Sequence, residues 1–377
     1  NLTAITDANN GDIDMGTLAV TGTIALTTND AANDNTGHAT VVNATAVQLA
    51  ASSVDGNFSA TATNGNITQT GALAITGTTT LVTSENNATI TLETSTNKFG
   101  DTGVGNVDLS TQGTSGHVSL VQGDNQGYLT FDTSEVRGNL TVKTGTGGRV
   151  TQAGILTVDG TTDINADDQG QNIYLNTSEN VLTGAVSMKS HWAKIQNSKA
   201  LELGTIDARG LAVTARGAVT QSGIVEAPNS SSTITAQNVA GDTKYDVTLE
   251  NTLNDLKTLV VVAADNVSLK DKNALILGAS SISGTFDLTT SGAVTQADAL
   301  EVASTTTIEA KSGDTYYAIT LDSVDGSSDY DNDFQGAVLL TGSNVEVDDL
   351  NDLDLGTSTV TGTYVARSLT GDITDAG

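Results

Sequence analysis

A run of aspartates near the C-terminal end of the sequence is the first place where the residue types could do chemistry. The carboxylates in this run are Asp325, Asp329, Asp331 and Asp333. Alternating aspartates on a loop can supply the oxygen ligands that Ca²⁺ prefers. The chain lacks both the EF-hand loop pattern and the Gly-Gly-x-Gly-x-Asp repeat of calcium-binding β-rolls. A solvated acidic turn is therefore the first interpretation and a Ca²⁺ site at these residues is the alternative, so no cofactor is required.

The other polar residues do not form a recognisable catalytic set. His38, His117 and His191 show no zinc-ligand spacing, and the chain has no cysteine. No Gly-x-Ser-x-Gly elbow is present. Carboxylate pairs of the kind that glycosidases use arise by chance in a chain this acidic and carry no signal. The sequence therefore predicts that the protein is not an enzyme, and a polysaccharide-active β-helix enzyme is a less favoured alternative.

The composition excludes several classes of protein. The 377 residues include 44 Asp and Glu against 15 Lys and Arg, which gives a formal net charge of −29. Such a surface repels phosphate, so nucleic acid is not an expected partner. The longest apolar run, Leu259 to Ala264, is far shorter than the ~20 residues of a membrane-spanning helix, so no transmembrane segment is expected. Plentiful β-branched residues in a regular pattern argue against disorder.

One phrase, Gly-x-[Ile/Val]-Thr-Gln, recurs along the chain and defines a long repeat. Its glutamines are Gln69, Gln152, Gln221 and Gln296, and Asp375 takes this place in the last copy. A second phrase, from Asn-Val to Leu-x-Leu-Gly, occupies residues 266–278 and 344–356 and keeps a similar period. Repeats of this length indicate stacked structural units. The approximate super-repeats are residues 11–64, 65–147, 148–216, 217–291 and 292–370, with residues 371–377 starting the next.

Between these phrases, apolar and polar residues alternate over three to five positions, as in residues 139–143 and 156–158. This alternation predicts short strands, and the Gly, Asn, Asp and Ser residues between them predict turns. We therefore expect an all-β fold, a parallel β-helix (β-solenoid) that is continuous over residues 1–377. A super-repeat of ~75 residues divides into four coils of ~19 residues, which gives about 20 coils stacked ~4.8 Å apart. Thr70-Gly71 breaks a strand, so we expect Gln69 at a corner, bonded to turn backbone.

The repeat phrases resemble those of filamentous-haemagglutinin-like exoproteins, which Gram-negative bacteria export by two-partner secretion. In those arrays G-x-[IV]-T-Q-x-G-x-L-x-V-x-G-T-T precedes N-D-F-x-G-x-V. Residues 65–79 match the first element and residues 332–338 match the second. The resemblance covers nearly the whole chain, most loosely in residues 27–64. It implies a right-handed parallel β-helix, display on the bacterial cell surface or release from it, and an adhesive or filamentous role.

The sequence and the resemblance together predict an extracellular structural or adhesive protein. It would be a stiff β-helical shaft that presents distal modules or forms a matrix. The expected partners are further copies or a continuation of the chain, since residues 371–377 restart the phrase of residues 11–16, and cell-surface glycans. The alternative is a carbohydrate- or Ca²⁺-binding adhesin module. Trp192 could stack on sugar, although filling of the core or a corner is the first interpretation. An ice-binding solenoid is less favoured, because Thr-x-Thr does not recur in every coil.

Overall fold

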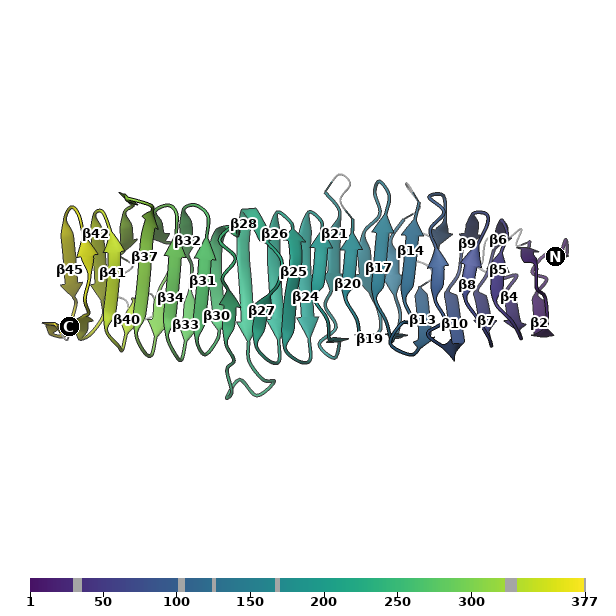
Figure 1. Ribbon diagram of the computed structural model, residues 1–377, viewed down its shortest axis with the longest axis horizontal. Coiled ribbons are helices and arrows are strands. Elements are labelled where there is room, and N and C mark those ends of the chain that lie inside the picture. Colours follow the sequence, from purple (N-terminus) through teal and green to yellow (C-terminus); the bar gives the residue numbers. More distant parts are fainter. Residues whose placement is uncertain (30–35, 101–105, 124–126, 167–169, 323–330, 376–377) are drawn as a thin grey trace. The chain divides into compact units, whose positions relative to one another are not determined.

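The computed structural model describes residues 1–29, 36–100, 106–123, 127–166, 170–322 and 331–375. Within these residues every regular element is a β-strand, and no helix is long and apolar enough to cross a membrane. The expected fold class is confirmed, because parallel strands stack as a β-solenoid of about 17 turns. The chain divides into two compact units, Asn1–Asn197 and Ser198–Gly377, and within each unit the strands of successive turns lie side by side (Figure 1).

Unit 1 contains two long parallel ladders, because each turn adds one strand to the first ladder and then one to the second. The first ladder consists of Leu2–Ile5 (β1), Thr23–Thr27 (β3), Val47–Leu49 (β5), Ile67–Gln69 (β8), Ile90–Leu92 (β11), Val118–Gln122 (β14), Leu140–Thr144 (β17), Thr162–Asn165 (β20) and Val186–Lys189 (β23). The second consists of Ile13–Leu18 (β2), Ala39–Asn43 (β4), Phe58–Ala62 (β7), Thr79–Asn86 (β10), Val107–Gln112 (β13), Leu129–Phe131 (β15), Val150–Gln152 (β18), Asn172–Leu175 (β21) and Trp192–Asn197 (β24). Shorter ladders add a third side to some turns, and they are Ser52–Val54 (β6) with Leu73–Ile75 (β9) and Lys98–Phe99 (β12), and Ser134–Val136 (β16) with Leu156–Val158 (β19) and Val181–Leu182 (β22).

Unit 2 repeats this arrangement. Its first ladder consists of Leu201–Asp207 (β25), Val219–Gln221 (β27), Val247–Leu249 (β29), Val267–Asp271 (β31), Phe286–Thr290 (β34), Thr306–Ser312 (β37), Val338–Gly342 (β41), Leu353–Leu355 (β43) and Ile373–Asp375 (β46). The second consists of Gly210–Ala215 (β26), Val225–Ala236 (β28), Asp255–Ala263 (β30), Leu275–Leu277 (β32), Val294–Gln296 (β35), Ile319–Leu321 (β39), Val345–Asp349 (β42) and Tyr364–Ser368 (β45). The remaining strands are Ser280–Ile282 (β33), Leu300–Val302 (β36), Thr315–Tyr316 (β38), Asp333–Phe334 (β40) and Thr359–Val360 (β44).

The alternation seen in the sequence becomes an inside and an outside of each turn. In β7, Phe58, Ala60 and Ala62 are buried, whereas the two residues between them are partly exposed. Because successive side chains of a strand point to opposite faces, the apolar set of every turn stacks on that of the next. The core is therefore a column of Val, Leu, Ile, Ala and the five phenylalanines, all of which are buried.

The turns differ in length, and this corrects the expected coil count. Val267 pairs with Phe286, which is 19 residues further along, whereas Thr79 pairs with Val107, which is 28 residues further along. The longer turn carries extra residues between its strands, and the β10–β13 pairing itself shifts register between Val82 and Asn86. The chain consequently makes about 17 turns rather than about 20.

The long sequence repeat spans three and a half turns, not four. In unit 1, the ladder that holds Gln69 in β8 reaches β17 three turns later, and the chain then runs half a turn further to Gln152 in β18 of the other ladder. In unit 2, Gln221 lies in the first ladder, Gln296 in the second and Asp375 in the first again. Within each unit, successive copies of the phrase therefore lie on alternate ladders.

Candidate functional site

A glutamine–asparagine pair, with the asparagine buried and the glutamine partly exposed, lies at each Gly-x-[Ile/Val]-Thr-Gln phrase. Nε2 of Gln69 donates to Oδ1 of Asn97 over 2.8 Å, and Nδ2 of Asn97 donates back to Oε1 of Gln69 over 2.9 Å. Gln221 and Asn254 make the same exchange, at 2.9 Å in both directions. The other two pairs are Gln152 with Asn180 and Gln296 with Asn332. All four asparagines are fully buried, so these pairs belong to the core.

The pairs complete the hydrogen bonds of a corner where one strand ends and the next begins. Oδ1 of Asn97 also accepts the backbone N–H of Leu73, the first residue of β9, over 3.0 Å. Nε2 of Gln69 also donates to the carbonyl of Gly71 over 2.7 Å. Buried backbone groups that lack partners are costly, and a corner breaks the strand ladder that would otherwise supply them. The prediction that Gln69 lies at a corner and bonds turn backbone is confirmed, whereas its partner Asn97 was not predicted.

A third polar side chain extends each pair into what we call a polar column. The four polar columns are Gln69–Asn97–Gln122, Gln152–Asn180–Asn197, Gln221–Asn254–Asp271 and Gln296–Asn332–Asp349. The third side chain accepts the backbone N–H of the residue two places after the asparagine, which is Phe99, Leu182, Leu256 and Phe334 in turn. Each column therefore ties three consecutive turns together. The third member is an amide in unit 1 and a carboxyl in unit 2.

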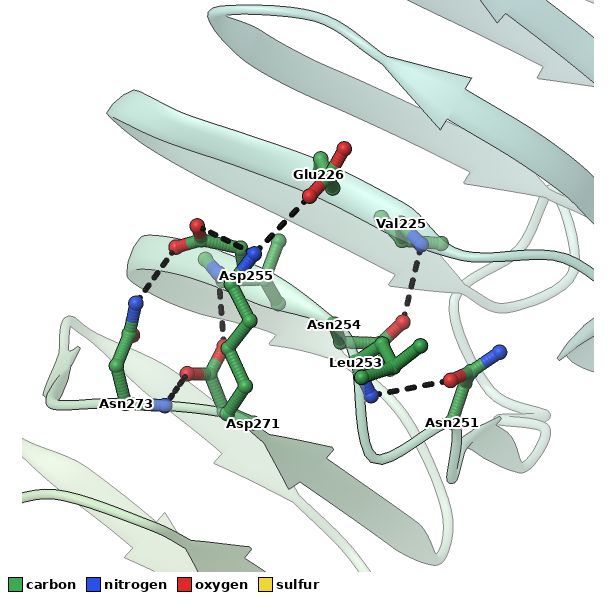
Figure 2. Close-up of polar contacts among 10 residues, drawn as sticks. Val225, Glu226, Asn251, Leu253, Asn254, Asp255, Asp271 and Asn273 are labelled. Atoms are coloured by element: carbon green, nitrogen blue, oxygen red, sulfur yellow. Dashed lines mark hydrogen bonds and ion pairs between the residues drawn. The ribbon is translucent and has the colours of Figure 1, made fainter.

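Figure 2 shows the carboxyl of Asp271 at one of these corners. Its Oδ2 accepts the N–H of Leu256 over 2.7 Å, and its Oδ1 accepts the N–H of Asn273 over 2.9 Å. The residue is only 3% exposed. Burial raises the pKa of Asp271 to about 6, and the negative charge of Asp255 adds to this, while the two N–H donors oppose it. The side chain thus changes charge near neutral pH inside the core.

Asp349 occupies the equivalent place in the other column of unit 2. Its Oδ2 accepts the N–H of Phe334 and its Oδ1 that of Asn351, both over 3.1 Å. The residue is fully buried, and burial raises the pKa of Asp349 to about 6. Nearby Asp333 acts in the same direction. Two independent corners therefore place a carboxyl with a raised pKa at the same structural position.

An ion-pair group covers the first of these corners from outside. Nζ of Lys272 lies 3.0 Å from a carboxylate oxygen of Glu226 and 3.0 Å from one of Asp255. Leu350 takes the place of Lys272 at the other corner. The lysine and its partners are partly exposed, so this group contributes little to stability.

The polar columns are suited to fixing backbone rather than to catalysis. Gln and Asn are neither nucleophiles nor bases, and both oxygens of Asp271 and of Asp349 accept backbone N–H groups. Their chemistry is hydrogen bonding between turns, together with a change of charge near neutral pH.

The aspartates that the sequence offered for Ca²⁺ fall partly beyond the described residues. Asp325 and Asp329 lie outside them. Asp331 is buried, and Asp333 in β40 accepts side-chain N–H groups from Gln335 over 3.0 Å and Asn351 over 3.1 Å. Within the described ranges, no group of three or more His, Cys, Asp or Glu residues is placed to hold a metal. The Ca²⁺ site therefore stays a prediction.

Two of the histidines belong to another set of corners. Nδ1 of His38 accepts the N–H of Asn57 over 2.9 Å, and Nδ1 of His117 accepts that of Asn139 over 2.8 Å. The side-chain oxygen of Asn57 then accepts the N–H of Thr78 in the following turn. These histidines lie at turns, as predicted, in a position that asparagine fills in the next turn.

A family model matches most of the chain in five consecutive segments. It is described as repeats of unknown function (DUF5649), and it covers residues 36–106, 115–189, 191–263, 264–341 and 342–377. The complete segments have about the length of the super-repeats proposed from the sequence but are offset from them along the chain. No curated protein and no solved structure is significantly similar to the chain.

Proposed function

The chain belongs to the family described as repeats of unknown function (DUF5649), and we propose that its repeats form the stiff shaft of an extracellular structural or adhesive filament. In this role the protein spans distance, and it presents other modules or builds a matrix. The stacked turns of the solenoid themselves provide this mechanical function.

The observation that carries this proposal is the continuity of the hydrogen bonding within each unit. Both long ladders of unit 1 pass from strand to strand over the whole unit, and the same holds for unit 2. Bending or stretching a stack of turns must open many of these bonds together, because each turn is held by its neighbours rather than by itself. The polar columns add side-chain bonds between turns where the ladders break at corners.

The proposed extracellular location rests on the resemblance of the repeat phrases. The repeat phrases resemble those of exported exoproteins. The lack of cysteine is compatible with this location, because such a chain folds after export without needing oxidation, but it does not by itself indicate the compartment. The net charge of −29 keeps such a surface soluble and disfavours aggregation through exposed edges.

Electron microscopy of the native source tests the proposal. Antibodies against this chain should label intact, unpermeabilised cells or released fibres, and the labelled structures should be elongated. Labelling that requires permeabilised cells, or labelled particles that are round and compact, would overturn the proposal.

A further inference from the structure

Arg149 is held between two tyrosine rings rather than beside a carboxylate. The guanidinium carbon lies 4.8 Å from the ring centre of Tyr128 and 5.7 Å from that of Tyr174. Its Nε is covered and has no hydrogen-bond partner. By contrast, Arg137 and Arg367 pair with carboxylates. Within the part of the chain that the structure describes, no carboxylate pairs with Arg149, although the chain carries a net charge of −29. The described part of the chain therefore neutralises this positive charge with no carboxylate of its own.

The surrounding residues form an outward row on consecutive turns of unit 1. Tyr128 precedes Leu129 and Arg149 precedes Val150, and these two apolar residues are paired in the second ladder. In the next two turns Asn172 pairs with Trp192 directly. The residues that directly follow Tyr128, Arg149 and Trp192 are buried, so these three point outward. Rungs of a parallel ladder lie ~4.8 Å apart, so the row extends along the axis of the unit.

The row is held in place by contacts of its own. Nδ2 of Asn172 donates to the hydroxyl of Tyr174 over 2.7 Å, which fixes one of the two rings around Arg149. Tyr174 pairs with Lys194 in the following turn, which brings a second cation to the row. The rings are half-buried, whereas all five phenylalanines of the chain are buried in the core. Trp192 and the two tyrosines therefore fill no core position.

We infer that Tyr128, Arg149, Tyr174 and Trp192 form a binding platform for an acidic polysaccharide, one that carries uronic-acid carboxylates. Aromatic faces stack on the C–H faces of sugar rings, and guanidinium binds carboxylate through two parallel hydrogen bonds. Tyr128 and Tyr174 lie two rungs apart, ~10 Å along the axis, and are offset by two residues along the strand, so they suit every second sugar of an extended chain. Arg149 and Lys194 place positive charge at the platform, so the attraction for a carboxylate is local to these turns, whereas the net charge of −29 repels a polyanion elsewhere on the chain.

The inference goes beyond the proposed shaft, because it assigns a ligand to the side of the solenoid. It depends on the row in unit 1 and not on filament formation. The two proposals can therefore fail separately. Fibres that do not bind polysaccharide would contradict only the platform, and polysaccharide binding by a protein that forms no fibres would contradict only the shaft.

Binding of the full chain to polygalacturonate, measured by isothermal titration calorimetry, tests the platform. Charged hydrogen bonds contribute about 1.5–3 kcal/mol, so Arg149→Gln should weaken binding about ten- to a hundredfold. Trp192→Ala should weaken binding as well. Arg137→Gln is the matched control, since Arg137 already pairs with Glu135 and Asp159, and it should bind like the unchanged protein.

A second arm needs no substitution, so it does not depend on whether the variants fold. Polygalacturonate whose carboxyls have been reduced to alcohols should bind at least tenfold more weakly to the unchanged chain. Equal binding of the reduced polymer, full binding by Arg149→Gln, or equal binding of single-stranded DNA would overturn the assignment. Absence of binding to any uronic-acid polymer would overturn it too.

Discussion

Gln221 and Asn254 stand 33 residues apart in the sequence and exchange two hydrogen bonds of 2.9 Å inside unit 2. The asparagine also accepts the N–H of Val225 and donates to the carbonyls of Leu249 and Lys270 (Figure 2 shows its bond to Val225). One buried side chain thus joins backbone from three turns. Removing a side chain of a polar column should therefore reduce the stability of the fold more than removing another side chain of similar size.

Replacing that asparagine should destabilise unit 2. Asn254→Ala leaves the N–H of Val225 and the carbonyl of Leu249 without their side-chain partner, and we expect a loss of about 3 kcal/mol. Urea unfolding of the full chain measures the change. Asn229→Ala, on an exposed part of β28, is the control and should lie within about 0.5 kcal/mol of the unchanged chain. Similar midpoints for the two variants would show that the column contributes nothing special.

Acidification from about pH 6 to about pH 4 should stabilise unit 2. Asp271 and Asp349 have pKa values raised from 3.8 to about 6 in the fold. Their protonation therefore favours the folded state: this stability is fully present below about pH 4 and is lost as pH rises through about 6. Each carboxyl accounts for up to about 3 kcal/mol. Hydrogen exchange of peptides from residues 255–277, followed from pH 7.5 to 4, should show protection that grows mainly below about pH 6, after correction for intrinsic rates.

The corresponding variant separates this effect from that of overall charge. Asp271→Asn with Asp349→Asn should flatten the pH dependence, since the buried charges are gone. Asp287→Asn with Glu301→Gln removes the same charge from exposed positions and should leave the dependence in place. A dependence that survives the first pair would assign it to general surface repulsion instead.

Close packing of turns at the corners makes one glycine of the repeat phrase irreplaceable. A Cβ at Gly71 would lie 2.5 Å from the backbone nitrogen of Ala51 in the preceding turn. The backbone must move to admit it, so Gly71→Ala should cost about 1–3 kcal/mol. Thermal unfolding followed by circular dichroism measures this. Gly16→Ala, where nothing lies within 4 Å of the added carbon, should melt like the unchanged chain, and equal melting of both variants would contradict the prediction.

Whole turns should be removable from the solenoid, whereas half turns should not. Residues 267–285 form one turn, because Val267 pairs with Val247 on one side and Phe286 on the other. Deleting them brings Phe286 into register with Val247, so a cooperative thermal transition should remain. Deleting residues 267–276 moves inward residues out of register and should abolish it. Loss of cooperativity in both deletions would mean that this turn is not an independent rung.

Chelation should leave the fold unchanged if the acidic turn is a solvated one. Asp333 already accepts two amide N–H groups and is a poor free ligand. The melting temperature of the full chain should therefore be the same with EDTA and with Ca²⁺. A Ca²⁺-dependent rise that disappears in Asp331→Asn with Asp333→Asn would instead establish the metal site.

The sequence predicted the strands and their stacking well. Alternation of apolar and polar residues that recurs in so many short segments indicates β-strands with one buried face. Residues 139–143, for example, alternate in the sequence and alternate between buried and exposed in β17. The corner position of Gln69 followed from Thr70-Gly71 in the same way. Patterns over a few neighbouring residues were thus enough to predict the strands and this corner.

The partner of each glutamine could not be predicted, because the distance along the chain varies with the loops in between. Asn97 lies 28 residues after Gln69, but Asn332 lies 36 residues after Gln296. A signal did exist: Asn332-Asp333-Phe334 matches the N-D-F element of the similar exoprotein arrays, and Asn97-Lys98-Phe99 shares its form. The same variation hid the number of turns in a repeat, since a period of 75 residues fits either four short turns or three and a half longer ones.

A repeat of three and a half turns makes each unit two-sided. A Gly-x-[Ile/Val]-Thr-Gln corner on one ladder is followed one period later by an equivalent corner on the other ladder, as at Gln221 and Gln296. Two consecutive copies of the repeat are therefore needed before the same corner returns to the same ladder.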